Sequence, residues 1–177
     1  MSKAAEFLFV PEPTEAWLRE AMAPQLRPDD LKELSCYGGE SPADELVRCW
    51  RDAQHRAAVV TTDLEPIFVF GVRPIADGLR PGGLIWLLAT NYADKRPRLF
   101  CDLVEGIVAE MLRAYCTLGN LVSVDCARTI RWLEYMHFTV RRDMLVRVGD
   151  GDFHPFVIKA PEVQLCAGIS RSTPQMH

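Results

Sequence analysis

The most regular pattern in the chain is an apolar residue at every fourth position of one segment. These residues are Leu99, Leu103, Ile107 and Met111. Side chains four residues apart lie on one face of an α-helix, so the pattern predicts an amphipathic helix over residues 98–115. We expect this helix to anchor the core, because burying each such side chain contributes about 1.5–3 kcal/mol.

Two apolar segments flank this helix, and a shorter helix follows them. Residues 83–90 and 120–125 are predicted strands, and residues 127–136 are a predicted helix. A strand, a helix and a strand of this length form a βαβ unit with parallel strands. Ligands on such sheets lie beyond the carboxyl ends of the parallel strands. This predicts a site formed by residues 90–98 on one side and residues 125–128 on the other.

The first half of the chain predicts shorter helices and an antiparallel hairpin. Thr14 and Ser41 are expected N-caps, each just before a segment with helical spacing. The predicted helices are residues 14–22, 27–34 and 41–50, and the predicted strands are residues 7–10, 56–62 and 66–72. Residues 63–65 are the expected hairpin turn. Residues 73–83 contain two prolines and three glycines and are therefore predicted to be a loop.

These elements predict an α/β (α+β) fold: a mixed, mainly antiparallel sheet with a central parallel βαβ unit and flanking helices. The 177 residues are enough for one domain with its own core, which we place at residues 1–160. Residues 161–177 are the expected C-terminal tail, since residues 170–175 have little apolar content.

Composition argues against several kinds of partner. The formal net charge of −4 disfavours general nucleic-acid binding, which needs a basic surface. No apolar run approaches the roughly 20 residues that span a bilayer, and the first residues lack the pattern of a secretory signal. We therefore expect a cytoplasmic location with no membrane and no sequence-specific nucleic-acid partner. The six cysteines form no C-x-x-C pair, so we expect neither a metal site nor a disulfide scaffold.

The order of elements resembles the GNAT acyltransferase fold over residues 7–159. Within that fold, two segments resemble a group of internal virion proteins from short-tailed phages. The segments are Tyr115-Cys116-Thr117-Leu118-Gly119-Asn120-Leu121-Val122-Ser123-Val124 and Ile130-Arg131-Trp132-Leu133. The resemblance implies a role in the phage particle or its assembly. It also implies other phage structural proteins as partners, association with further copies of the chain, and a location in the host cytoplasm and then in the virion.

The resemblance to GNAT enzymes also implies a place for acyl-CoA. Those enzymes bind the CoA pyrophosphate through backbone N–H groups in a loop of the form [QR]-x-x-G-x-[GA] at a helix N-terminus. The corresponding residues 91–98 contain no glycine, Pro97 removes an N–H donor, and Asp94 adds a negative charge. If acyl-CoA binds, the residues expected to contact it are Leu88, Thr90, Lys95, Arg96 and Arg98.

The family's catalytic positions are also altered. GNAT enzymes usually have an Asn after the fifth core strand, a Tyr about seven residues later that protonates the leaving thiolate, and a Gly-Phe at the helix end. Counted back from Phe138, these positions fall on Cys126, Leu133 and His137. The remaining catalytic candidates are Tyr135 as an acid, Cys126 as a nucleophile, and Glu65 as a base near a strand end.

Two hypotheses follow from these features. The first is a GNAT-fold component of a phage particle, with a degenerate acyl-CoA site, no cofactor and no acetyltransferase activity. The alternative is an active acyl-CoA-dependent N-acyltransferase that uses acetyl-CoA through a divergent loop. A ligand sensor that keeps the pocket without chemistry is a third option, because fold alone does not fix function.

Overall fold

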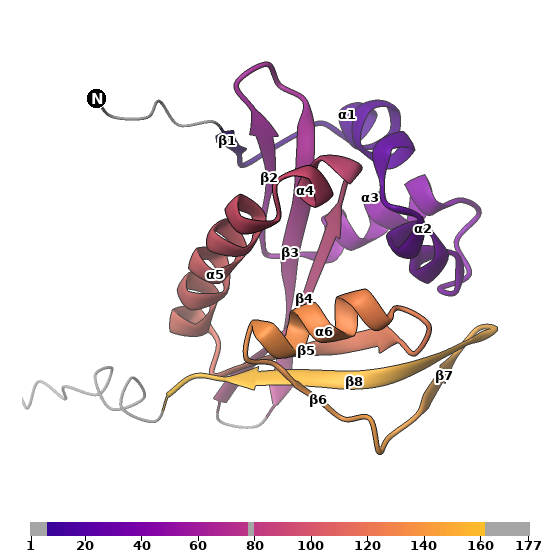
Figure 1. Ribbon diagram of the computed structural model, residues 1–177, viewed down its shortest axis with the longest axis vertical. Helices are drawn as coiled ribbons and strands as arrows, with labels where there is room; N and C mark the ends of the chain where they lie inside the picture. Colours follow the sequence, from indigo (N-terminus) through magenta and orange to yellow (C-terminus); the bar gives the residue numbers. More distant parts are fainter. Residues whose placement is uncertain (1–6, 78–79, 162–177) are drawn as a thin grey trace, which may run out of the picture.

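The computed structural model describes residues 7–77 and 80–161 as one sheet with helices on both faces (Figure 1). The eight strands follow the order β1-β2-β3-β4-β5-β8-β6, and β7 pairs with β8. Neighbouring strands are antiparallel except β4 and β5, which are parallel. The strands are β1 Phe7–Val10, β2 His55–Thr61, β3 Pro66–Asp77, β4 Arg80–Ala89, β5 Thr117–Ser123, β6 Thr139–Val140, β7 Val146–Val148 and β8 Gly151–Lys159. The predicted fold class is confirmed.

The helices divide between the two faces of the sheet. The α-helices are α1 Glu15–Trp17, α2 Pro28–Ser35, α3 Pro42–Asp52, α4 Asn91–Lys95, α5 Pro97–Ala114 and α6 Ala127–Tyr135. A π-helical turn, Leu18–Met22, and a 3-10 turn, Ala23–Gln25, continue α1. One core cluster joins the sheet to α5 and α6, and a second joins it to the segment from α1 to α3.

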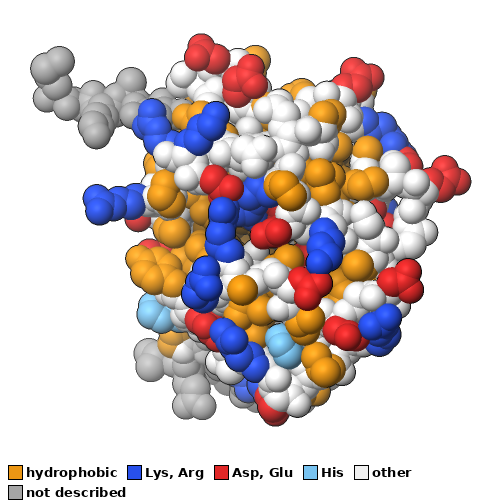
Figure 2. All heavy atoms as spheres, turned by 45° about the vertical axis from the view of Figure 1, so that its right-hand side comes forward, with side chains coloured by type: hydrophobic (Ala, Val, Ile, Leu, Met, Phe, Trp, Pro, Cys, Tyr) orange, Lys and Arg blue, Asp and Glu red, His pale blue; other side chains and the backbone are white. Residues whose placement is uncertain are grey.

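The surface mixes charges of both signs. Figure 2 shows basic and acidic side chains interspersed on one face, with apolar side chains between them. In the described part of the chain, no helix is long and apolar enough to cross a membrane.

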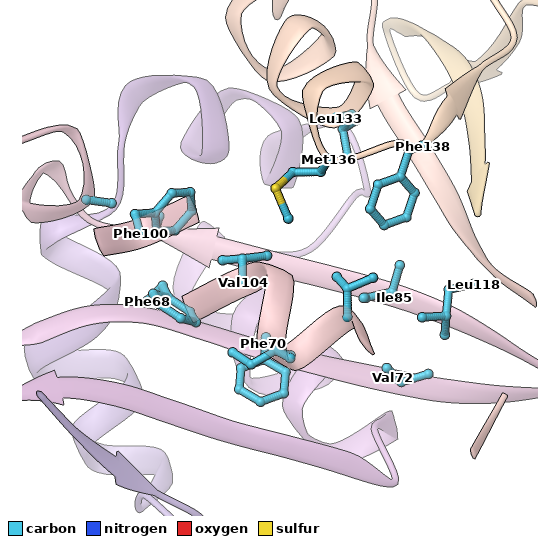
Figure 3. Packing of buried hydrophobic residues seen from close by; sticks show 14 of the residues in the cluster. Phe68, Phe70, Val72, Ile85, Phe100, Val104, Leu118, Leu133, Met136 and Phe138 are labelled. Atoms are coloured by element: carbon cyan, nitrogen blue, oxygen red, sulfur yellow. The ribbon is translucent and has the colours of Figure 1, made fainter. Parts of the chain in front are cut away.

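The predicted central helix is confirmed as α5, and it supplies much of the first core. Phe100, Val104, Ile107 and Val108 are its buried residues. Their neighbours across the core include Phe68 and Leu118, which are fully buried (Figure 3). The expected N-caps are also confirmed: Thr14 Oγ1 accepts from Trp17 N at 3.1 Å, and Ser41 Oγ accepts from Asp44 N at 3.2 Å.

The prediction of a loop over residues 73–83 is wrong. Strand β3 continues to Asp77 and β4 starts at Arg80, with Arg73 opposite Leu84 and Pro74 opposite Gly83. A proline interrupts a strand only where its missing N–H would have met a partner. Among the described residues, β2 pairs with β3 only as far as Val72, so Pro74 has β4 on one side and no strand on the other. The turn at residues 78–79 and the predicted tail beyond residue 161 lie outside the described residues.

Candidate functional site

The parallel strands β4 and β5 separate soon after they meet. They pair only through Gly82 with Thr117, Gly83 with Leu118 and Leu84 with Gly119. At the next position, the side-chain amide of Asn120 takes the place of a strand–strand hydrogen bond. Its Nδ2 donates to Ile85 O at 2.9 Å, and its Oδ1 accepts from Leu121 N at 2.8 Å. Beyond Asn120 the two strands leave a gap, at the carboxyl ends where a site was expected.

Helix α2 spans the wide end of this gap. Asp30 Oδ2 accepts from Ala89 N at the end of β4, at 2.9 Å. Glu33 Oε1 accepts from Ser123 N at the end of β5, at 2.8 Å. Each strand end therefore donates one backbone N–H to a carboxylate of the same helix.

A cavity of about 730 Å³ follows the gap from one face of the sheet to the other. Its walls include Val104, Trp132 and Leu133 on the side of α5 and α6, and Glu33 and Tyr37 on the side of α2. This volume lies within the range of about 300–1,000 Å³ that small-molecule sites have. The cavity is therefore large enough to hold an elongated ligand.

Two hydrogen-bond donors in the cavity wall have no acceptor. Among the described residues, the buried indole Nε1 atoms of Trp86 and Trp132 lack a partner. Trp86 packs against the α1–α3 cluster and Trp132 against the α5–α6 cluster, so one donor lies on each face of the sheet. A buried unpaired N–H costs about 1–3 kcal/mol, which water or a ligand carbonyl in the cavity would offset.

Glu33 is the titratable group whose environment most resembles that of a catalytic base. Burial raises its pKa from 4.5 to about 7, and the nearby carboxylates of Asp30 and Asp29 act in the same direction. Burial also raises the pKa of Asp30, which pairs with Arg27 Nε at 2.9 Å. A carboxyl group with a pKa near neutrality can both take up and release a proton at the pH of the cell.

The segment in the position of the pyrophosphate loop is a short helix rather than the loop that was predicted. Thr90 caps α4, because its Oγ1 accepts from Tyr92 N at 3.2 Å. Ala93 N donates to Thr90 O, and Arg96 N donates to Ala93 O. Backbone N–H groups that are engaged within the segment in this way are not directed at an anion.

A smaller cavity of about 280 Å³ lies beside α4, with Arg27, Asp94 and Arg128 in its wall. The carboxylate of Asp94 forms an ion pair with Arg128 and lies 3.8 Å from Arg27 Nη1. The two arginines that could meet a phosphate in this cavity therefore already face a carboxylate.

Only some of the residues that were expected to contact acyl-CoA lie in the walls of these two cavities. Leu88 lies in the wall of the larger one. Thr90 is buried and donates its hydroxyl to Pro66 O, in addition to capping α4. Lys95, Arg96 and Arg98 are exposed and lie in the wall of neither cavity. Contact of these residues with a cofactor stays a prediction.

The catalytic candidates are also scattered. Tyr135 is 71% exposed, and Glu65 is exposed in the β2–β3 turn. Cys126 is buried beside Glu33, and burial together with that carboxylate raises its pKa to about 12, so the thiol stays protonated. Leu133, in the family's tyrosine position, lies in the cavity wall. His137, in the glycine position, has a φ of +65°.

Sequence reasoning missed Glu33, Asp30 and Arg27. Asp30 and Glu33 both lie on α2. Their spacing of three residues places both carboxylates on one face of the helix, which is the signal that could have been used. In the described residues, no group of three or more His, Cys, Asp or Glu side chains could hold a metal ion.

A scan against protein-family models and a search of curated proteins found no match. Solved structures do match over nearly the whole chain. Ribosomal-protein-S5-alanine acetyltransferase from Vibrio fischeri has a TM-score of 0.61 and 9% identity, covering 90% of this chain and 96% of that chain. A GNAT-family acetyltransferase from Bacillus anthracis has a TM-score of 0.59 and 10% identity, covering 89% and 97%. Spermidine N-acetyltransferase from Vibrio cholerae, in complex with CoA and spermine, has a TM-score of 0.55 and 12% identity, covering 89% and 97%.

At these identities the likeness concerns the fold alone. The strand order, the single parallel pair and its gap agree with that likeness. The resemblance to internal virion proteins stays a prediction. The chain has the fold of the GNAT acetyltransferases.

Proposed function

We propose that this chain is a GNAT-fold component of a bacteriophage particle or of its assembly, and that it does not transfer acetyl groups. The segments that resemble internal virion proteins lie around the gap. Asn120 bridges β4 and β5, Leu118 is fully buried beside that junction, and Trp132 and Leu133 form part of the cavity wall. The two segments that resemble internal virion proteins therefore lie in the part of the fold that forms the cavity wall.

The observation that carries the proposal is the carboxylate of Asp94 between Arg27 and Arg128. A CoA pyrophosphate at this end of the gap would have to displace that carboxylate and would meet its negative charge at close range. Like charges at about 4 Å repel by about 4 kcal/mol near a protein surface. The backbone N–H groups of Tyr92 and Ala93 in α4 already donate to Thr90, so they do not offset this repulsion by donating to a phosphate.

The centre of the gap supports the same proposal. A departing CoA thiolate needs a proton donor, but Leu133 stands in the family's tyrosine position. Ala89 N and Ser123 N already donate to carboxylates, which leaves the indole N–H groups of Trp86 and Trp132 as the unpaired donors in the cavity wall. Acyl transfer would therefore require displacement of Asp94 at the phosphate end and a proton donor other than residue 133.

The same proposal assigns partners and location. The chain would contact other phage structural proteins and further copies of itself, first in the host cytoplasm and then in the virion. Mass spectrometry of purified particles tests this assignment, with detection at a fixed copy number as the expected result. Recovery of the chain only from the soluble fraction of infected cells would contradict it.

Isothermal titration of the full chain with CoA and with acetyl-CoA tests the loss of the cofactor site. We expect no measurable heat of binding up to millimolar ligand. Micromolar binding that disappears in the Arg96→Ala, Arg98→Ala double variant would overturn the proposal and place the phosphates on the predicted basic residues.

A second candidate function, acyl-CoA-dependent N-acyltransfer, is favoured by Glu33. Its pKa of about 7 and its position in the cavity wall suit a base that deprotonates an acceptor amine. This candidate predicts transfer of labelled acetyl groups to an amine, with a rate that rises through pH 7 and is lost in Glu33→Gln. Absence of transfer together with absence of CoA binding would exclude it.

A further inference from the structure

Helix α2 joins two strands that no longer pair with each other. Asp30 and Glu33 lie one helical turn apart, and their carboxylates accept from Ala89 N on β4 and from Ser123 N on β5. Arg27, just before α2, adds a backbone hydrogen bond from its N to Ala89 O at 3.0 Å. The width of the gap at this end therefore depends on hydrogen bonds to side-chain carboxylates.

The two carboxylates differ in their charge neighbours. Asp30 has the guanidinium of Arg27 at hydrogen-bond distance, on Oδ1 as well as Oδ2. Glu33 has no such cation among its described neighbours. The groups that face it are Asp29 and Asp30 from its own helix, the thiol of Cys126 at the start of α6, and Tyr37 after α2. Lys32 is engaged with Asp125 at 2.5 Å.

We propose that Asp30 and Glu33 are positioning residues that form a carboxylate latch across the gap, and that the charge on Glu33 sets how firmly this latch closes. A protonated Glu33 still accepts from Ser123 N through its carbonyl oxygen, without placing a second negative charge beside Asp30. An ionised Glu33 keeps this hydrogen bond and that of the Cys126 thiol, but it places a second negative charge beside Asp30 in a largely buried place. Moving α2 outward lets water solvate that charge.

The direction of the pH dependence follows from the pKa of Glu33 in the two states. The pKa is about 7 with the latch closed, whereas a solvated carboxyl group in the open state has its ordinary value of 4.5. The closed state therefore binds the proton more tightly, so closure is favoured fully below pH 4.5 and progressively less up to pH 7. The closing equilibrium changes across this window by up to about 300-fold, the factor that corresponds to pKa values of 4.5 and about 7.

The latch is independent of either candidate function. A particle component would use it to control the shape of the gap, and an acyltransferase would use it to admit a ligand. Its test needs neither CoA nor an acceptor, so failure of the latch and failure of the proposed function are separately visible.

Amide hydrogen exchange, measured by NMR on the full chain between pH 5 and pH 8, tests the latch. The readouts are the protection factors of Ser123 N and Ala89 N, after correction for intrinsic exchange. We expect both to fall by about tenfold or more as pH rises, because both carboxylates belong to one helix. Protection factors that stay constant over this range in the wild-type chain would overturn the proposal.

Three variants locate the titrating group. Glu33→Gln keeps an acceptor oxygen but cannot ionise, so both protection factors should stay high at every pH. Asp30→Asn removes a neighbouring negative charge, so the midpoint of the change at Ser123 should move to lower pH. Glu105→Gln, an exposed position on α5, is the matched control and should behave as wild type. A pH dependence in Glu33→Gln equal to that of the wild type would also overturn the proposal.

Discussion

The two halves of the sheet differ in how they are held together internally and how they are held to each other. Within the first half, β3 and β4 pair from Phe68 and Ala89 to Asp77 and Arg80 without a break. Within the second half, β5 and β8 pair along the whole of β5. Between the halves, β4 and β5 share only three residue pairs. Beyond these pairs, β4 and β5 are linked by the side-chain amide of Asn120 and by the carboxylates of Asp30 and Glu33 on α2.

This difference places two kinds of connection within one sheet. In each half, a continuous backbone hydrogen-bond ladder joins the strands, β3 with β4 and β5 with β8. The junction depends on particular side chains, so it can be altered without unfolding either half. In such an arrangement a cavity can pass through a sheet, and individual polar residues can control it.

The largest expected effect is at the apolar part of the junction. Leu118→Ala removes a fully buried side chain at one of the three residue pairs. We expect the free energy of unfolding to fall by about 2–5 kcal/mol, measured by urea denaturation. Leu145→Ala, at a leucine that is 68% exposed, is the control and should change it by less than about 0.5 kcal/mol. Equal losses in the two variants would contradict this view of the junction.

The next effect concerns the amide bridge. Asn120→Ala leaves Ile85 O and Leu121 N without their side-chain partner. We expect a loss of about 2–3 kcal/mol in the free energy of unfolding, because two polar groups lose hydrogen bonds at a partly buried place. Asn91→Ala, at the exposed first residue of α4, should change the free energy little. If Asn120→Ala leaves the free energy of unfolding unchanged, water replaces the hydrogen bonds of the Asn120 amide without loss of stability.

A smaller effect is expected from Glu33, with a sign that depends on pH. Its pKa rises from 4.5 to about 7 on folding, so the folded chain loses stability as pH increases through this window. Glu33→Gln should therefore raise the free energy of unfolding by about 1–2 kcal/mol at pH 8 and leave it nearly unchanged at pH 4.5. Urea denaturation at the two pH values checks this. A variant less stable than wild type at pH 8 would contradict the assignment.

The smallest expected effect is on the affinity for CoA, at the end of the gap beside α4. Asp94→Ala frees Arg27 and Arg128 from a carboxylate. We expect CoA to bind about tenfold more tightly, by about 1.4 kcal/mol, so that isothermal titration detects a heat of binding at millimolar ligand, where the wild-type chain gives none. Asp102→Ala, at an exposed position on α5, serves as the control. No gain in Asp94→Ala would mean that the engaged amides of α4, rather than Asp94, exclude phosphate.

Much of the fold could be predicted because it depends on local periodicity. The four-residue spacing from Leu99 onward identified α5, and Thr14 and Ser41 identified helix starts through a single side-chain hydrogen bond. The extension of β3 through Pro74 could not be predicted, because it depends on where the neighbouring strand β2 ends.

The site was less predictable for a related reason. Glu33 and Ser123 are ninety positions apart, and no local pattern shows that their backbone and side chain meet. The short helix α4 was missed because Thr90, assigned to the preceding strand, also acts as an N-cap. Asn120 was noted as part of a motif, but its role as a bridge depends on how β4 and β5 diverge.

The short junction between β4 and β5 also has a mechanical consequence. Tension applied by two partners, one bound to each half of the sheet, would cross three residue pairs, the hydrogen bond from Cys116 N to Pro81 O, one carboxamide and the two carboxylates of α2. Fewer bonds share the load there than between β3 and β4. Under force the molecule should yield first along the gap and lengthen by separating its halves, while each half keeps its own hydrogen-bond ladder.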